Sequence, residues 1–315
     1  MSFRKVAIDS RLVQPGDIFF ALRGEKDDGH NYVLDALQRG AQGVVVEREV
    51  QGILGANIWR LNGLALALAT MAPPFAFLVE DTLQALQKLS AYHRAQYPCR
   101  AIGVTGSLGK TTAKEAIWAV LKERYVTLRS QGNFNSEIGL PLTLLEIGPQ
   151  HQRVVLEMGM YALGEIRLLC ELAKPECGLV TNVGPVHLER LGSLEAIARA
   201  KAELVEALPR GGVAFLNGDD PWVRAMAQHT RASTFTFGLQ PENDLYADGI
   251  ESRGLAGISF RLHHQGEAIP VASPLRGRES IWACLAGAAV GQVEGLGWEE
   301  IVRGLGSAIE QPRLR

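Results

Sequence analysis

Residues 100–230 alternate short apolar runs with longer amphipathic stretches, and this pattern predicts strands followed by helices. Such alternation indicates a mostly parallel sheet covered by helices on both faces, an α/β fold. Ligands of these sheets bind at the carboxyl ends of the strands. We expect strands at 101–105, 126–129, 154–157, 178–182 and 213–217, and helices at 110–123, 164–173, 194–208 and 221–229.

The segments on either side of this region have a different pattern. The first part of the chain predicts a small separate α/β unit, with strands at 17–22 and 43–47 and a helix at 32–40. A helix at 82–97 should connect it to the rest, so we expect two domains, 1–82 and 83–315. After residue 233, runs at 234–237, 257–262 and 268–271 predict antiparallel strands, followed by helices at 279–293 and 298–308.

Composition narrows the class of protein. The chain has 315 residues, 32 basic and 34 acidic, for a net charge of −2, so no overall field favours nucleic acid or anionic membranes. Four cysteines stand without metal-site spacing, which is typical of a reducing compartment, and no signal peptide begins the chain. We expect a cytoplasmic protein.

The apolar stretch 64–79 is interrupted by two prolines and is shorter than the ~17–25 residues of a spanning helix, so we expect a core segment or an insertion.

One motif carries most of the functional information. The segment Gly103–Thr112, GVTGSLGKTT, lies between a predicted strand and a predicted helix, as in phosphate-binding loops. It departs from the strict Walker pattern because Val104 stands five residues before Gly109. Backbone N–H groups of such a loop surround an anion, and the Lys and Thr side chains can reach terminal phosphates and Mg²⁺. The alternative is a glycine-rich turn that binds nothing. The expected phosphate site comprises Thr105, Gly106, Ser107, Leu108, Gly109, Lys110, Thr111 and Thr112.

Other polar residues lie where strands should end, and their chemistry alone leaves alternatives open. Glu157 ends a buried strand, where a carboxylate is either a magnesium ligand or a solvated acid. His187 follows the next strand, and because Mg²⁺ prefers oxygen, its chemistry favours a hydrogen-bonding loop residue. Lys201 on a helix is typical of a solvated face. Turn chemistry accounts for Asn133, Asn135 and Asn217.

Several segments together resemble the Mur ligase family. In the N-terminal part these are Asp9-Ser10-Arg11, PGDIFFALRG at 15–24 and Asp28-Gly29-His30. In the central part they are TGSLGKTTAKE, GNFNSEIGLPLTLL, LEMGM and GSLEAIARAKAEL. The likeness runs from about residue 8 to the end and is looser at 51–80. Folylpolyglutamate synthases share the ATPase core but lack the two N-terminal motifs.

This resemblance implies roles for individual residues. Lys110, Thr111 and Asn217 would belong to the ATP site, while Glu157 and His187 would hold Mg²⁺. Lys201 would carry a carbamate and act at a second Mg²⁺. The resemblance also implies a UDP-substrate domain at the N-terminus, with substrate contacts at Ser10, Arg11, Asn133 and Asn135.

The implied reaction is ATP-driven amide-bond formation in peptidoglycan precursor synthesis. A carboxylate of a UDP-N-acetylmuramoyl-peptide would attack the γ-phosphate, and the amine of D-alanyl-D-alanine would displace phosphate from the acyl phosphate. Because the reactants are anionic, Lys110 and the metal ions would be needed to bring them together. The catalytic residues that the resemblance implies are Lys110, Lys201 and His187.

The chain also departs from the family pattern. Glu279, Ser280 and Ala283 stand where a histidine and two asparagines are usual, and Ser136 replaces another asparagine. The sequence stops where a third, C-terminal domain should begin. We therefore expect weak or no ligation by this chain alone. Two alternatives stay open: a non-catalytic UDP-substrate-binding relative, or half of a split enzyme whose partner chain supplies the third domain.

Overall fold

The computed structural model describes residues 3–24, 27–49, 58–60, 73–186 and 188–308. It divides into two compact units, Met1–Tyr92 and His93–Arg315. The division falls within helix α2 (Thr82–Ala95), after the boundary expected at residue 82. The helix predicted at 82–97 is confirmed.

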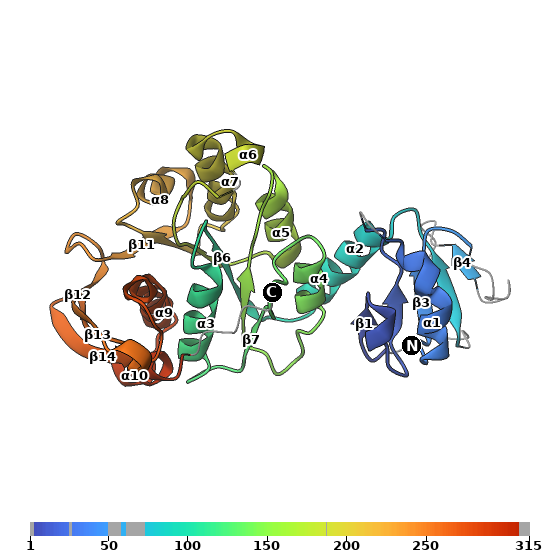
Figure 1. The fold of residues 1–315 in the computed structure, drawn as a ribbon, viewed down its shortest axis with the longest axis horizontal. Helices are drawn as coiled ribbons and strands as arrows, with labels where there is room; N and C mark the ends of the chain where they lie inside the picture. Colours follow the sequence, from blue (N-terminus) through green and yellow to red (C-terminus); the bar gives the residue numbers. More distant parts are fainter. Residues whose placement is uncertain (1–2, 25–26, 50–57, 61–72, 187, 309–315) are drawn as a thin grey trace. The chain divides into compact units, whose positions relative to one another are not determined.

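The N-terminal unit is built on a parallel sheet of five strands in the order β1-β2-β3-β5-β4 (Figure 1). Helix α1 (Val33–Gln38) follows a 3-10 turn (Gly29–Tyr32) and buries Val33 and Ala36 in the core of this unit. Of the apolar stretch 64–79, residues 64–72 lie outside the described part, and Phe75–Leu78 forms a strand paired on both sides, as expected of a core segment. The strands are β1 Val6–Ala7, β2 Ile18–Phe20, β3 Gly43–Val46, β4 Ile58–Arg60 and β5 Phe75–Leu78.

The central unit contains a nine-stranded sheet in the order β14-β13-β12-β11-β10-β9-β6-β8-β7. The strands from β7 to β12 in this order pair in parallel, and β12, β13 and β14 pair antiparallel. The bounds are β6 Arg100–Thr105, β7 Thr127–Arg129, β8 Arg153–Glu157, β9 Cys177–Val180, β10 Val213–Asn217, β11 Ser233–Gly238, β12 Leu245–Ser252, β13 Ile258–His264 and β14 Glu267–Ser273.

One prediction about this sheet is wrong. The run 234–237 was expected to be antiparallel, but β11 is parallel to β10, from the pair Val213–Ser233 to the pair Asn217–Phe237. The connecting segment 218–232 contains helix α8 (Pro221–Ala225) and a 3-10 turn (Met226–His229), which return the chain to the starting edge of the sheet. Such a crossover produces a parallel pair. Strand β12 was not predicted.

Helices cover both faces of the central sheet, as predicted. Alternate residues of β10 show this, because Phe215 packs in one core cluster while Ala214 and Leu216 pack in another. The Phe215 cluster includes α3, α9 and α10, and the other includes α7 and α8 (Figure 1). The bounds are α3 Lys110–Leu121, α4 Gly139–Leu144, α5 Glu165–Ala173, α6 Leu188–Leu191, α7 Leu194–Glu206, α9 Ile281–Val293 and α10 Trp298–Gly306.

Two consequences of this fold bear on function. The parallel strands β6, β8, β9 and β10 all end at one edge of the sheet, which we call the carboxyl edge, at Thr105, Glu157, Val180 and Asn217. The polar residues that the sequence predicted to lie at strand ends therefore gather there. In the described part of the chain, no helix combines the length and apolar character needed to cross a membrane.

Candidate active site

The loop between β6 and α3 requires its glycines. Gly106 has φ +147°, and a Cβ added there would lie 1.8 Å from Oγ1 of Thr181. Gly109 has φ +76° and is the residue that directly precedes α3. Both backbone conformations are disfavoured for other residues. The loop therefore turns tightly from a buried strand to a helix N-terminus, which is the geometry of an anion site.

Side chains beyond β9 hold this loop in place. The Asn182 side-chain oxygen accepts a hydrogen bond from the Leu108 N–H at 2.9 Å, and its amide donates to the Leu108 carbonyl at 3.0 Å. The Thr181 hydroxyl donates to the same carbonyl at 2.7 Å. The Ser107 hydroxyl donates to the Gly184 carbonyl at 3.0 Å and accepts from its N–H at 2.8 Å. Sequence reasoning did not assign Asn182 this role, although its position after a strand was a signal.

Lys110, the first residue of α3, lies over the loop. Its ammonium donates to the carbonyls of Gly106 at 2.9 Å and Ser107 at 3.2 Å. Burial lowers the pKa of Lys110, while the nearby Glu157 raises it. The ammonium is thus placed at the rim of the loop, where a bound phosphate would offer it a stronger partner than neutral carbonyls.

Glu157 is the centre of a polar cluster at the end of β8. It is only 3% exposed, which excludes the alternative of a solvated acid. Its Oε2 accepts a hydrogen bond from the Thr111 hydroxyl at 2.9 Å, and its Oε1 accepts one from the Asn135 side chain at 2.9 Å. A hydroxyl and a carboxylate beside a phosphate loop form an oxygen donor set that fits Mg²⁺.

Two residues that sequence reasoning missed support Glu157. Lys114 is fully buried, and its ammonium lies 3.7 Å from Oε2 of Glu157 and donates to the Ser130 carbonyl at 2.8 Å. The Ser130 hydroxyl in turn accepts the Glu157 N–H at 3.0 Å. Lys114 lies four residues after Lys110, one helical turn further along α3, but the sequence did not show what it would face.

A cavity of about 210 Å³ adjoins the loop, and Gly106, Lys110, Asn135 and Lys201 lie on its wall. Lys201 on α7 is 2% exposed, so it does not lie on a solvated helix face. Burial lowers its pKa to about 7, and the positive charge of Lys110 contributes. The cavity therefore holds an amine that is partly neutral at physiological pH next to a cationic one.

The remaining expected residues of the central unit lie at different places around the loop and the strand ends. The Thr105 hydroxyl donates to the Met158 carbonyl at 2.8 Å, and Thr112 is half-buried in the first turn of α3. The Asn217 amide donates to the Thr181 carbonyl at 2.8 Å, so it joins the ends of β10 and β9. Asn133 is exposed in the turn that carries Asn135. His187 lies outside the described residues, as does the end of the chain from residue 309.

In the N-terminal unit the expected substrate residues lie on the 3-10 turn Ser10–Leu12. Ser10 is buried and hydrogen-bonds Asp35, whereas the exposed Arg11 pairs with Asp9 at 2.7 Å.

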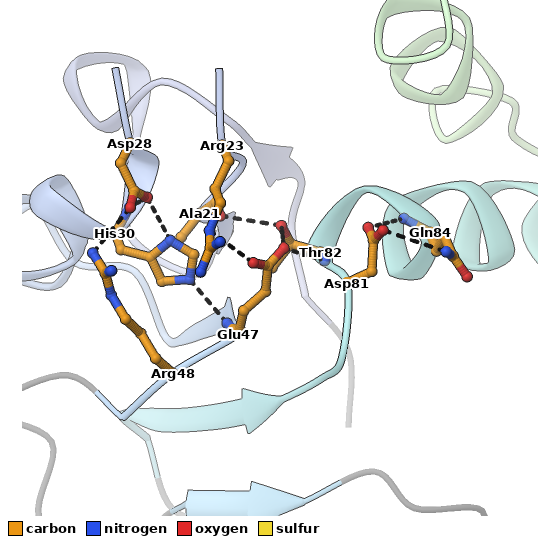
Figure 2. A network of polar contacts seen from close by, with 9 residues as sticks. All are labelled: Ala21, Arg23, Asp28, His30, Glu47, Arg48, Asp81, Thr82 and Gln84. Carbon is orange, nitrogen blue, oxygen red and sulfur yellow. Dashed lines mark hydrogen bonds and ion pairs between the residues drawn. The ribbon is translucent and has the colours of Figure 1, made fainter. Parts of the chain in front are cut away.

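Figure 2 shows a second polar network in this unit, which centres on His30. The buried His30 ring bonds Asp28 through Nδ1 at 2.6 Å and accepts the Glu47 N–H through Nε2 at 2.9 Å. The Glu47 carboxylate accepts the N–H and hydroxyl of Thr82, both at 2.9 Å, and pairs with Arg23. The network ties the ends of β2 and β3 to the start of α2.

Family models match most of the chain. The model described as "Mur ligase middle domain" matches residues 104–291, and that described as "Mur ligase family, catalytic domain" matches residues 2–94. The chain belongs to the Mur ligase family. The sequence-based identification is thereby confirmed, and the loop, Glu157 and Lys201 all lie within the matched middle domain.

Individual Mur ligases are similar over nearly the whole chain. The UDP-N-acetylmuramoyl-tripeptide--D-alanyl-D-alanine ligase of Synechocystis sp. is 40% identical over 98% of this chain and 62% of the relative. That of Escherichia coli is 34% identical over 95% of this chain and 62% of the relative. The chain thus spans about 62% of the length of these curated relatives.

Solved structures agree with this assignment. A crystal structure of MurF from Acinetobacter baumannii superposes with a TM-score of 0.85 at 30% identity, covering 99% of this chain and 64% of that one. MurF ligase from Thermotoga maritima in complex with ADP superposes with a TM-score of 0.81 at 27% identity, covering 98% of this chain and 67% of that one. The expected α/β fold is confirmed.

Proposed function

We propose that this Mur ligase joins D-alanyl-D-alanine to UDP-N-acetylmuramoyl-tripeptide at the expense of ATP. The observation that carries the proposal is the pairing of Thr111 with the buried Glu157 directly beside the loop closed by Gly106 and Gly109. The names of the similar ligases supply the substrates. The reaction would take place in the cytoplasm as a step of peptidoglycan precursor synthesis.

Nucleotide binding would use the loop and the first turn of α3. The loop N–H groups and Lys110 would hold the phosphates, with Asn217 further along the carboxyl edge. Mg²⁺ would be held by Thr111 and Glu157 together with phosphate oxygens, and His187 is a further candidate. No group of three acidic, histidine or cysteine side chains converges within the described residues, but Mg²⁺ at a nucleotide needs only one or two carboxylates. The ion would neutralise charge at the transferred phosphate.

Lys201 would contribute as a carbamate. A neutral amine attacks CO₂ and loses a proton, which converts a cationic side chain into an anionic one. The lowered pKa of about 7 supports this role, because a lysine at its ordinary pKa would be almost entirely protonated. A carbamate at this position would face the same cavity as Lys110 and Asn135.

The N-terminal unit would bind the UDP-substrate through Ser10 and Arg11, and Asn133 and Asn135 in the central unit are further candidates for substrate binding. In this assignment residues 1–82 form the UDP-substrate domain and residues 83–315 the ATP-binding domain.

Titration calorimetry tests the proposal. The chain 1–315 is titrated with a non-hydrolysable ATP analogue with and without Mg²⁺, and separately with the UDP-N-acetylmuramoyl-tripeptide. Mg²⁺-dependent nucleotide binding, together with binding of the UDP-substrate, supports the proposal. Phosphate release from ATP that needs both substrates would show in addition that the expectation of weak or no ligation by this chain alone is wrong. Retained UDP-substrate binding without any nucleotide binding would identify a non-catalytic relative instead.

A further inference from the structure

One face of helix α3 carries polar and aromatic side chains against the edge of the central sheet. Positions i, i+3, i+4 and i+7 of a helix share a face, and in α3 they are occupied by Thr111, Lys114, Glu115 and Trp118. The Lys114 ammonium donates to the carbonyl of Ser130, the residue that follows β7, and the Trp118 indole N–H donates to the Thr127 carbonyl at 2.9 Å. This face therefore packs over β7.

A row of charges of alternating sign extends along this face to the end of β8. The Arg129 guanidinium stacks on the Trp118 ring, 3.4 Å from the ring centroid, and its Nε lies 2.9 Å from Oε2 of Glu115. The Lys114 ammonium lies 3.4 Å from Oε1 of Glu115 and 3.7 Å from Oε2 of Glu157. Lys114 is fully buried, and both carboxylates are less than 5% exposed. The order from Arg129 to Glu157 is therefore cation, anion, cation, anion.

This order leaves Glu157 without surplus negative charge. A divalent ion that enters a buried site gives up water, and a carboxylate already matched by an ammonium repays this cost poorly. The phosphates of a nucleotide at the adjoining loop would supply the missing negative charge. They would also engage the ammonium of Lys110, so Lys110 would not replace Lys114 in the balance.

We propose that Lys114 is a positioning residue that acts through Glu157, because its charge prevents a divalent ion from binding there alone and makes the ion enter together with the nucleotide. This inference rests on the proposed function, which assigns the nucleotide and metal sites. Glu115 limits the effect of Lys114. It shares the ammonium with Glu157, so the Glu157 carboxylate still binds the ion once phosphate is present.

The first test measures the binding of Mn²⁺ alone to the chain 1–315, with electron paramagnetic resonance of the free ion as the readout. Lys114→Met should bind Mn²⁺ without nucleotide about tenfold more tightly than the wild type, because a positive charge within 4 Å of Glu157 is removed. Adding Glu157→Gln to Lys114→Met should abolish this binding, which distinguishes an ion at Glu157 from ions at surface acids.

The second test changes the other neighbour of Lys114. Glu115→Gln leaves the Lys114 ammonium with Glu157 as its carboxylate partner in this row, so the gain in affinity for an ATP analogue that Mg²⁺ provides should fall several-fold in calorimetric titrations. The two variants should thus shift metal binding in opposite directions. A variant that only disturbs packing would weaken metal binding in both cases.

Lys122 provides the matched control. It lies at the exposed end of α3, where its ammonium is 4.6 Å from the centroid of the Trp118 ring. Lys122→Met removes the same type of charge from the same helix, away from Glu157. It should bind Mn²⁺ alone, and nucleotide with Mg²⁺, as the wild type does.

The results distinguish this inference from the function on which it rests. If the wild type binds no nucleotide in the presence of Mn²⁺, the proposed nucleotide site itself is wrong. If it binds nucleotide with Mn²⁺ but also binds Mn²⁺ alone as tightly as Lys114→Met, the role of Lys114 is refuted and the proposed function stands. If Lys114→Met does not fold, Glu115→Gln decides, and an unchanged or larger Mg²⁺ effect in that variant refutes the charge balance.

Discussion

The hydroxyl of Thr111 and the carboxylate of Glu157 meet at 2.9 Å, although they come from different strand-to-helix units. Thr111 lies in the first turn of α3 and Glu157 ends β8, the strand that pairs in parallel with β6. Parallel pairing of β6 and β8 therefore brings the phosphate loop and the carboxylate to the same edge, and several predictions depend on this arrangement.

Replacing Glu157 tests the metal site directly. Glu157→Gln should abolish most of the gain in nucleotide affinity that Mg²⁺ provides, because an amide carries no charge and is a weaker ligand than a carboxylate. Calorimetric titration of an ATP analogue with and without Mg²⁺ measures this gain. Glu165→Gln is the control, since Glu165 borders the same cavity and accepts the Tyr161 N–H. A full Mg²⁺ effect in Glu157→Gln would contradict the assignment.

The amine of Lys201 should react with CO₂ near neutral pH. Only the neutral amine reacts, so at fixed dissolved CO₂ the carbamate should increase as the pH rises through about 7. A carbamate carbon signal in ¹³C NMR after addition of labelled bicarbonate measures it, and Lys201→Met should lack the signal. If the wild type shows the same spectrum as Lys201→Met at every pH, Lys201 does not form a carbamate under these conditions.

The same group should make stability depend on pH. Burial lowers the pKa of Lys201 from 10.5 to about 7, so between these values the unfolded chain binds a proton that the native chain does not. The free energy of unfolding should therefore rise with pH across this range and lose its contribution from Lys201 as the pH falls through about 7. Urea titrations at several pH values test this in the absence of CO₂. Lys201→Met should show a flatter dependence, and an equally steep one would refute the effect.

Replacing Gly106 or Gly109 of the phosphate loop with alanine should lower the stability of the protein by different amounts. At Gly109 nothing lies within 4 Å of an added Cβ, so Gly109→Ala should cost only the left-handed backbone energy, about 1–2 kcal/mol. Gly106→Ala should cost more, because its Cβ would overlap the Thr181 hydroxyl that holds the loop. Thermal unfolding gives the ranking, and nucleotide affinity should fall further in Gly106→Ala. The reverse ranking would show that the loop is arranged differently.

The network in Figure 2 predicts that His30 stabilises the N-terminal unit. His30→Phe keeps an aromatic ring but removes the acceptor for the Glu47 N–H and the partner of Asp28. We expect a loss of about 1–3 kcal/mol in the free energy of unfolding. Arg48→Ala is the control, because it removes a half-exposed ion pair with Asp28 and should cost less than about 1 kcal/mol. Equal losses in the two variants would contradict a special role for His30.

Local patterns in the sequence were enough to predict much of this protein. The alternation of apolar and amphipathic stretches predicted β6, β8, β10, α3 and α7, because burial on a strand or a helix face imposes its own period on the chain. The motif from Gly103 to Thr112 predicted the phosphate loop, since its glycines and its position between strand and helix are local properties. Because Glu157 and Asn217 stand where strands were predicted to end, the sequence also indicated that they would lie at one edge of the sheet.

Tertiary structure alone decided which distant residues meet. The packing of separate strand-to-helix crossovers decides that Lys201 is buried and that Lys114 supports Glu157 through Ser130. It also decides that Asp219 accepts a hydrogen bond from Trp282. Such contacts produce no periodic pattern of residues in the sequence. The direction of β11 likewise depends on the path of α8 across the sheet. Sequence determines the elements because each buries its own apolar face, whereas the chemistry of the site arises from side chains that only the packing of those elements brings together.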